Sequence, residues 1–213
     1  MALKAEARPR SKTRDRVLQV ALALFNERGA DRVTTAEIAN AAGINEGNLY
    51  YYFQKKEQLV MALFDFFAAA MLATAETPIE DPSEPLSYTN YQRGWFKLMW
   101  DYRLFYRDGP ALRGMAPRLR ESLAELTGRG QQAVRRLFGL MRQHGFMRAT
   151  DDDIEVLIGN LWIVSSYWMD FRLIEHGAPV APEDLAWGFR QVERLVRPYL
   201  TERAVLMDEV PQV

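Results

Sequence analysis

The residues of this chain with the clearest chemical potential lie between positions 45 and 56. Asn48 carries a side-chain amide, and its paired donor and acceptor suit the adenine edge in the major groove of DNA. Gly47 would let the backbone approach a bound polymer closely. The hydroxyl of a tyrosine such as Tyr51 can reach a phosphate, and Lys56 adds a point charge for another phosphate. These residue types predict contact with nucleic acid.

Two short helices joined by a tight turn must position these side chains. Thr34 is suited to cap the first helix, and Glu37, three residues later, can bond back to the amide of the cap residue. Gly43 supplies the left-handed residue that ends this helix. Asn45 then caps the second helix with its side-chain oxygen. The pattern predicts a helix-turn-helix, and therefore a protein that binds DNA.

Three consecutive tyrosines end the second helix. At about 100° per residue, Leu49 and Phe53 share a face that can join a core, and Tyr51 lies on the opposite face. Filling of a core is the alternative role for the tyrosines, but the three of them span about 200° and cannot all be buried. The residues predicted to contact DNA are Thr34, Thr35, Asn45, Gly47, Asn48, Tyr50, Tyr51, Tyr52 and Lys56.

The run from 34 to 59 reads T-T-x-x-I-A-x-x-A-G-(x)3-G-x-L-Y-x-Y-F-x-x-K-x-x-L. It resembles the DNA-binding domain of the TetR family of bacterial transcriptional regulators over about residues 12–60. The resemblance implies a three-helix DNA-binding head, a larger helical ligand-binding body, a homodimer, and DNA affinity that changes on ligand binding. Glu46 departs from the pattern, because a basic or small residue is common there. An acid would repel phosphate unless it points aside, so Glu46 is not among the predicted contacts.

Composition and charge agree with such a protein. The chain has 213 residues, 48% of them hydrophobic, and no cysteine, which excludes disulfides and thiolate catalysis. Basic residues gather in a predicted flexible arm at residues 1–11, which could add salt-dependent contacts to DNA. The N-terminus lacks the apolar run of a signal peptide, and the most apolar stretch, 154–171, contains acids. We therefore expect a cytoplasmic protein with no membrane partner.

The apolar periodicity is helical throughout and predicts an all-α fold of about nine helices. The expected parts are the arm at 1–11, a helix-turn-helix domain at 12–58, a ligand-binding and dimerisation domain at 59–206, and a tail at 207–213. A helix over about 55–75 should be the only continuous link between the two domains, and residues 78–85 a linker. The other expected helices cover about 12–28, 87–107, a short segment ending at 117, 117–144, 150–175 and 182–199.

The second domain is rich in large aromatic residues, which suit a pocket for a bulky apolar or amphipathic molecule. Asp101 among them could meet a cationic ligand, although it could equally pair with Arg103 or Arg107. For any single aromatic residue, an ordinary place in the core remains the alternative. The residues predicted to line a pocket are Trp95, Trp100, Asp101, Phe105, Trp162 and Ser166.

The helix near 154–171 is apolar around almost its whole circumference, so it must be covered on all sides. A second copy of the chain could cover one side in a four-helix interface. The central helix of a monomeric bundle is the alternative. The residues predicted for the dimer interface are Ile158, Trp168, Phe189, Val192 and Val196.

No catalytic, cofactor or metal site is predicted. His144 and His176 lie near helix ends, where they can interact with the helix dipole. The sequence therefore predicts a homodimeric repressor that binds a palindromic operator in double-stranded DNA and is released by a small effector. Two alternatives stay open: a DNA-binding regulator without a ligand, and a small-molecule-binding or sequestering protein whose helix-turn-helix has lost its function.

Overall fold

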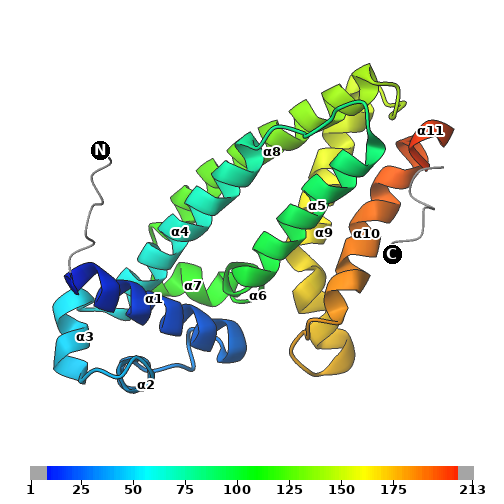
Figure 1. Ribbon diagram of the computed structural model, residues 1–213. Coiled ribbons are helices and arrows are strands. Elements are labelled where there is room, and N and C mark those ends of the chain that lie inside the picture. The colour runs from blue at the N-terminus through cyan, green and yellow to red at the C-terminus, as the bar shows by residue number, and fades with distance from the viewer. Residues whose placement is uncertain (1–8, 206–213) are drawn as a thin grey trace, which may run out of the picture. The chain divides into compact units, whose positions relative to one another are not determined.

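The computed structural model describes residues 9–205, and within this range the chain is helical with no strand, as the sequence predicts (Figure 1). Residues 1–8 and 206–213, which include most of the predicted arm and the whole predicted tail, lie outside the described range. The helices are α1 (Pro9–Arg28), α2 (Thr35–Ala41), α3 (Glu46–Tyr52), α4 (Lys56–Glu76), α5 (Pro85–Asp101), α6 (Leu104–Arg107), α7 (Gly109–Met115), α8 (Leu119–Gln143), α9 (Asp151–His176), α10 (Asp184–Val196), the 3-10 helix η1 (Arg197–Tyr199) and α11 (Glu202–Val205).

The chain divides into two compact units. Within the described range, unit 1 comprises residues 9–67 and 102–122, and unit 2 comprises residues 68–101 and 123–205. The sequence placed the boundary at residue 58 and assigned everything later to one domain, whereas residues 102–122 group with the N-terminal helices. The chain therefore passes between the units three times, within α4, after α5 and within α8. The expectation that α4 is the only continuous link is wrong, because α8 also continues from one unit into the other.

Unit 1 is held together by apolar contacts from all its helices. Phe25, Ile38 and Leu49 are fully buried on α1, α2 and α3. The ring of Phe105 on α6 stacks on Phe67 of α4, with the ring centroids 5.2 Å apart. Helices as short as α2 and α3 are marginal alone, so the burial of their apolar side chains, Ile38 and Leu49, is the main source of their stability.

Polar contacts join the end of α1 to α6. The side-chain oxygen of Asn26, which is 6% exposed, accepts a hydrogen bond of 3.0 Å from the amide of Leu104. The guanidinium of Arg107 donates to the carbonyls of Phe25 and Asn26, both at 2.9 Å, and pairs with the carboxylate of Asp108. These bonds satisfy carbonyl groups that the end of a helix leaves without an intrahelical partner.

In unit 2, α10 packs against both α9 and α5 (Figure 1). Thr150 caps α9 in a reciprocal box with Asp153, and these hydrogen bonds lower the pKa of the Asp153 carboxyl. Gly177 ends α9 with φ of +67°, a conformation that glycine adopts without strain. The buried residues of α9 are Ile154, Leu157, Ile158, Leu161, Trp168 and Met169.

The structure corrects two helix predictions. The expected helix over 87–107 is two helices, with α5 ending at Asp101 and α6 starting at Leu104. The amide of Leu104 bonds to the Asn26 side chain and not to the carbonyl four residues earlier, so the helix is interrupted there. With this division, and with the short α11 near the C-terminus, the described residues form eleven α-helices where about nine were expected.

By length and composition alone, α4 could cross a membrane, although the sequence led us to expect no such segment. Its apolar residues Leu59, Val60, Leu63, Phe64 and Phe67 are nevertheless buried within unit 1. A core helix of a globular protein passes the same test, and the burial of these residues fits that role.

Replacing Asn26 with alanine tests the contact between α1 and α6. The Asn26→Ala variant leaves the buried amide of Leu104 without its acceptor, so we expect the free energy of unfolding to fall by about 2 kcal/mol. Urea denaturation followed by circular dichroism measures this. Asn40→Ala, at an exposed position of α2, is the matched control and should change stability little. Equal stability of the two variants would contradict the role given to Asn26.

Candidate nucleic-acid interface and ligand pocket

The turn before α2 has the hydrogen bonds that the sequence predicts. The hydroxyl oxygen of Thr34 accepts from the amide of Glu37, and the carboxylate of Glu37 accepts from the Thr34 amide at 2.8 Å. Arg28 from α1 forms an ion pair with the same carboxylate at 2.9 Å. The hydrogen bonds from Thr34, strengthened by Arg28, hold the pKa of Glu37 below its usual range. The start of α2 is therefore fixed to the end of α1.

The following helix also begins as expected. The side-chain oxygen of Asn45 accepts from the amide of Asn48 at 2.7 Å, and Gly43 has φ of +64° in the turn before it. Leu49 and Phe53 face the core, and Tyr51 is 64% exposed. The prediction that at least one tyrosine faces outward is confirmed.

Glu46 lies at the first position of α3, and its carboxylate is held by two hydroxyl groups. Thr35 donates to Glu46 Oε1 at 2.9 Å, and the hydroxyl of Tyr50 donates to the same atom at 3.3 Å. The carboxylate is thus directed toward α2. It points aside, as an acid at this position must if it is not to repel phosphate. Thr35 and Tyr50, two of the predicted DNA contacts, are occupied with Glu46 in this structure. Gly47 and Asn48 are also exposed on α3.

Lys56 has partners that the sequence did not predict. Its ammonium group donates to the carbonyl oxygens of Ala30 at 2.7 Å and Val33 at 2.8 Å, and lies 3.5 Å from that of Asp31. Three N–H donors meeting three carbonyls leave no free donor for a phosphate. Lys56 therefore ties the start of α4 to the turn between α1 and α2, which does not support its expected role as a phosphate anchor. Its neighbour Lys55 is exposed.

The residues predicted to line one ligand pocket do not gather in one place. Phe105 is buried in unit 1, whereas the other five belong to unit 2. Ser166 is exposed on α9, and the ring of Trp162 packs over Gly130 of α8. Asp101 pairs with Lys97 one turn earlier on α5, so its charge is compensated. Trp95 contacts Tyr91 edge to face, and Trp100 alone of the six lines the pocket described next.

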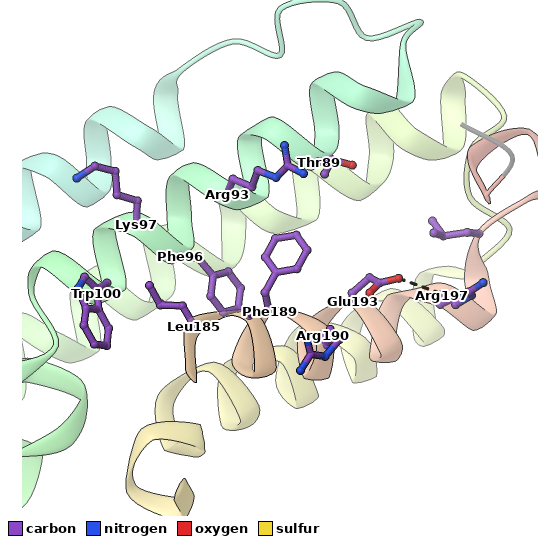
Figure 2. Close-up of a pocket in the computed structure, with 12 residues that line it drawn as sticks. Thr89, Arg93, Phe96, Lys97, Trp100, Leu185, Phe189, Arg190, Glu193 and Arg197 are labelled. Carbon is purple, nitrogen blue, oxygen red and sulfur yellow. Dashed lines mark ion pairs between the residues drawn. The ribbon is translucent and has the colours of Figure 1, made fainter. Parts of the chain in front are cut away.

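A pocket of about 740 Å³ lies between α5 and α10 in unit 2 (Figure 2). Its lining combines aromatic rings with four cationic side chains, Arg93, Lys97, Arg190 and Arg197, and one acid, Glu193. A signal for half of this lining is present in the sequence, because residues 89, 93, 96 and 100 recur at helical spacing on one face of α5. The residues of α10 that line the pocket lie about ninety positions later in the chain, and no pattern in the sequence predicts that they pack beside α5.

Most of the residues predicted for a dimer interface are covered within their own chain. Ile158, Trp168 and Val192 are buried in unit 2, and the ring of Phe189 packs edge to face on Phe96 of α5 at 5.2 Å; only Val196 lacks such a contact and is half-buried. These four residues are therefore not free for a second copy, and the apolar residues of α9 that remain exposed lie on the opposite face. The exposed apolar residues of that face are Val156, Ile163, Tyr167, Phe171 and Ile174.

Comparison with known proteins identifies the family. Residues 66–205 match the family model described as a bacterial transcriptional repressor, TetR, and residues 17–63 match that of the tetR family of bacterial regulatory proteins. A solved TetR-family transcriptional regulator from Marinobacter aquaeolei VT8 is similar with a TM-score of 0.81 and 31% identity, over 92% of this chain and 98% of that one.

Several curated relatives carry the name HTH-type transcriptional repressor KstR2. The one from Mycobacterium tuberculosis is 24% identical over 81% of this chain and 86% of its own length. The one from Mycolicibacterium smegmatis is 34% identical, but the match spans only 40% of this chain and 42% of that protein. With two family models that together cover the helix-turn-helix and the remaining helices, the chain belongs to the TetR family of bacterial transcriptional regulators.

Proposed function

We propose that this TetR-family protein is a cytoplasmic, ligand-responsive repressor that binds a palindromic operator as a homodimer and is released by a small effector. The observation that carries the proposal is the outward face of α3, where Gly47, Asn48 and Tyr51 are exposed around a buried Leu49. A short helix with this face can enter the major groove, with the amide of Asn48 directed to a base edge and the tyrosine to the backbone.

Relatives named as repressors support repression as the mode of action. Release by an effector requires that a ligand in unit 2 alters unit 1, and α4 is suited to carry that change because it runs unbroken through both. Displacement of its residues after Phe67 would change the separation of the two recognition helices in a dimer. They would then no longer match half-sites about one helical turn, or a multiple of it, apart.

The exposed stripe of α9 supports a homodimer. Val156, Ile163, Tyr167 and Ile174 recur at intervals of seven, four and seven residues, which places them on one face. Four large apolar side chains in one row are costly to leave in water, and a second copy of the same helix can cover them with a self-complementary contact. We therefore place the dimer interface on this exposed face of α9 and not on the buried residues that the sequence predicts.

The proposal is tested by selecting DNA from a random pool with the purified protein and then titrating the selected site by fluorescence anisotropy. We expect a palindromic sequence. Asn48→Ala should weaken its binding by about 1–3 kcal/mol and relax the preference at one base pair of each half-site. Gln54→Ala, exposed just after α3, is the control. Failure to enrich any sequence at low salt would overturn the regulator proposal.

A comparison of Lys56→Gln with Lys55→Gln separates a structural lysine from a phosphate contact. Because Lys56 is bound to the carbonyls of Ala30 and Val33, its replacement should lower the free energy of unfolding by about 1–3 kcal/mol. Lys55→Gln should leave stability unchanged. Lys56→Gln would contradict this role if it left the urea midpoint unchanged while reducing the slope of log affinity against log salt by about one.

The stripe on α9 predicts the effect of a charge placed within it. Ile163 is 66% exposed, so an Ile163→Glu chain should fold, but two buried carboxylates would face each other across the interface. We expect light scattering to show mainly dimers for the wild type and mainly monomers for this variant. Ala124→Glu, at an exposed position of α8, should remain dimeric. An Ile163→Glu dimer as stable as the wild type would exclude this face.

A further inference from the structure

The pocket between α5 and α10 has an excess of positive charge. Four cationic side chains line it against the single carboxylate of Glu193. Glu193 pairs with Arg197 at 3.8 Å, and Lys97 is compensated by Asp101. Arg93 and Arg190 form no ion pair with the residues that the structure describes. Two uncompensated guanidinium groups, one from each helix, therefore line the same pocket.

The pocket is also amphipathic along its length. At one end lie Trp100, Leu185 and Lys97, whose charge is paired with Asp101, and the rings of Phe96 and Phe189 meet in the middle (Figure 2). Toward the other end lie Thr89 and Arg93 on α5, near the end of α10 where Glu193 pairs with Arg197 (Figure 2). A molecule lying along the pocket would thus meet an apolar surface first and cationic or hydroxyl groups at its other end.

We propose that this pocket binds an amphipathic anion, with its apolar body on Phe96, Phe189 and Trp100 and a carboxylate or phosphate head on Arg93 and Arg190. Guanidinium groups bind both head groups through paired, charge-assisted hydrogen bonds. The volume of about 740 Å³ is that of a small-molecule site. The role of this ligand as effector rests on the proposed function, whereas its binding does not.

The charges decide against other ligands. A cationic amphiphile has the same apolar body but would meet repulsion from Arg93 and Arg190, so the pocket does not favour the cationic ligand that Asp101 left open. An acidic protein segment would also match the sign of the charge. A pocket of about 740 Å³ that is lined by the packed rings of Phe96 and Phe189 has the size of a small-molecule site and favours the small amphiphile.

The test uses the full-length protein and three probes below their micellar concentrations: decanoate, decyl phosphate and decyltrimethylammonium. Calorimetry should show binding of the two anions and at least about tenfold weaker binding of the cation. Quenching or enhancement of tryptophan fluorescence should accompany anion binding, since Trp100 lines the pocket. Comparison of the two anions shows whether a carboxylate or a phosphate is the better head group.

Variants locate the site. Arg93→Gln and Arg190→Gln lie at exposed positions, so both should fold, and each should weaken anion binding by about tenfold and reduce its dependence on salt. Arg194→Gln removes the same charge from α10 at an exposed position outside the pocket and should bind like the wild type. Equal losses in all three variants, equal binding of the cationic probe, or binding only of an acidic glutamate–leucine peptide would overturn the proposal.

Operator binding separates this inference from the proposed function. If both hold, decanoate or decyl phosphate weakens operator binding by the wild type and loses that effect in Arg93→Gln. If the protein binds its operator but neither anion, the proposed anion site is refuted and the proposed regulator function is supported. If the protein selects no DNA but binds an anion in a way that depends on Arg93 and Arg190, the proposed regulator function is refuted and the proposed anion site is supported.

Discussion

The carbonyl groups at the end of α1 and in the turn after it are the constraint on which unit 1 depends. They lie where the helical ladder stops; the carbonyl of Phe25 still accepts from the amide of Gly29, but those that follow have no next turn of helix to bond to, and burial of a carbonyl without a partner would be costly. Arg107 bonds to those of Phe25 and Asn26, and Lys56 bonds to those of Ala30 and Val33. Cations from α6 and α4 are thus fixed to one short piece of backbone, and α2, which follows it directly, takes its position from the same bonds.

The geometry at this piece of backbone also restricts which residues can occupy it. Gly29 ends α1 with φ of +95°, and a Cβ there would lie 2.8 Å from the carboxylate of Asp31. Arg107 can bond to two carbonyls and to both oxygens of Asp108 together because its guanidinium is a planar fork, which a lysine could not reproduce. A buried ion pair stabilises little by itself, but here the remaining donors are satisfied by backbone. The contact therefore acts chiefly to fix the orientation of α6 on α1.

Local features of the sequence predicted local structure well. The Thr34 box, the Asn45 cap and the turn at Gly43 each depend on residues within a few positions of one another, and all are present. The interruption of the helix at Leu104 could not be predicted in this way, since its cause is Asn26, seventy-eight residues earlier in the chain. The partners of Lys56 escaped prediction for the same reason. From the sequence alone, a lysine in this motif is a reasonable phosphate contact. Only the fold shows that backbone carbonyls already accept its hydrogen bonds.

The face of α9 that is left exposed and the charge of the pocket could not be read from the sequence, and the two have a common physical cause. A helix that is apolar around almost its whole circumference has no single apolar face. Its own sequence therefore cannot show which side is covered within the chain. That is decided by α10, where a Cβ at Gly188 would lie 2.8 Å from the Trp168 ring; the absence of a side chain lets Trp168 pack there and turns Ile163 outward. Likewise, Asp101 suggested a cationic ligand only while Lys97, one turn earlier on α5, and the cationic residues of α10 were left out of account. Lys97 neutralises that acid, and Arg190 from α10 lines the same pocket as Arg93. The excess of positive charge in the pocket therefore depends on a helix that only the fold brings beside α5.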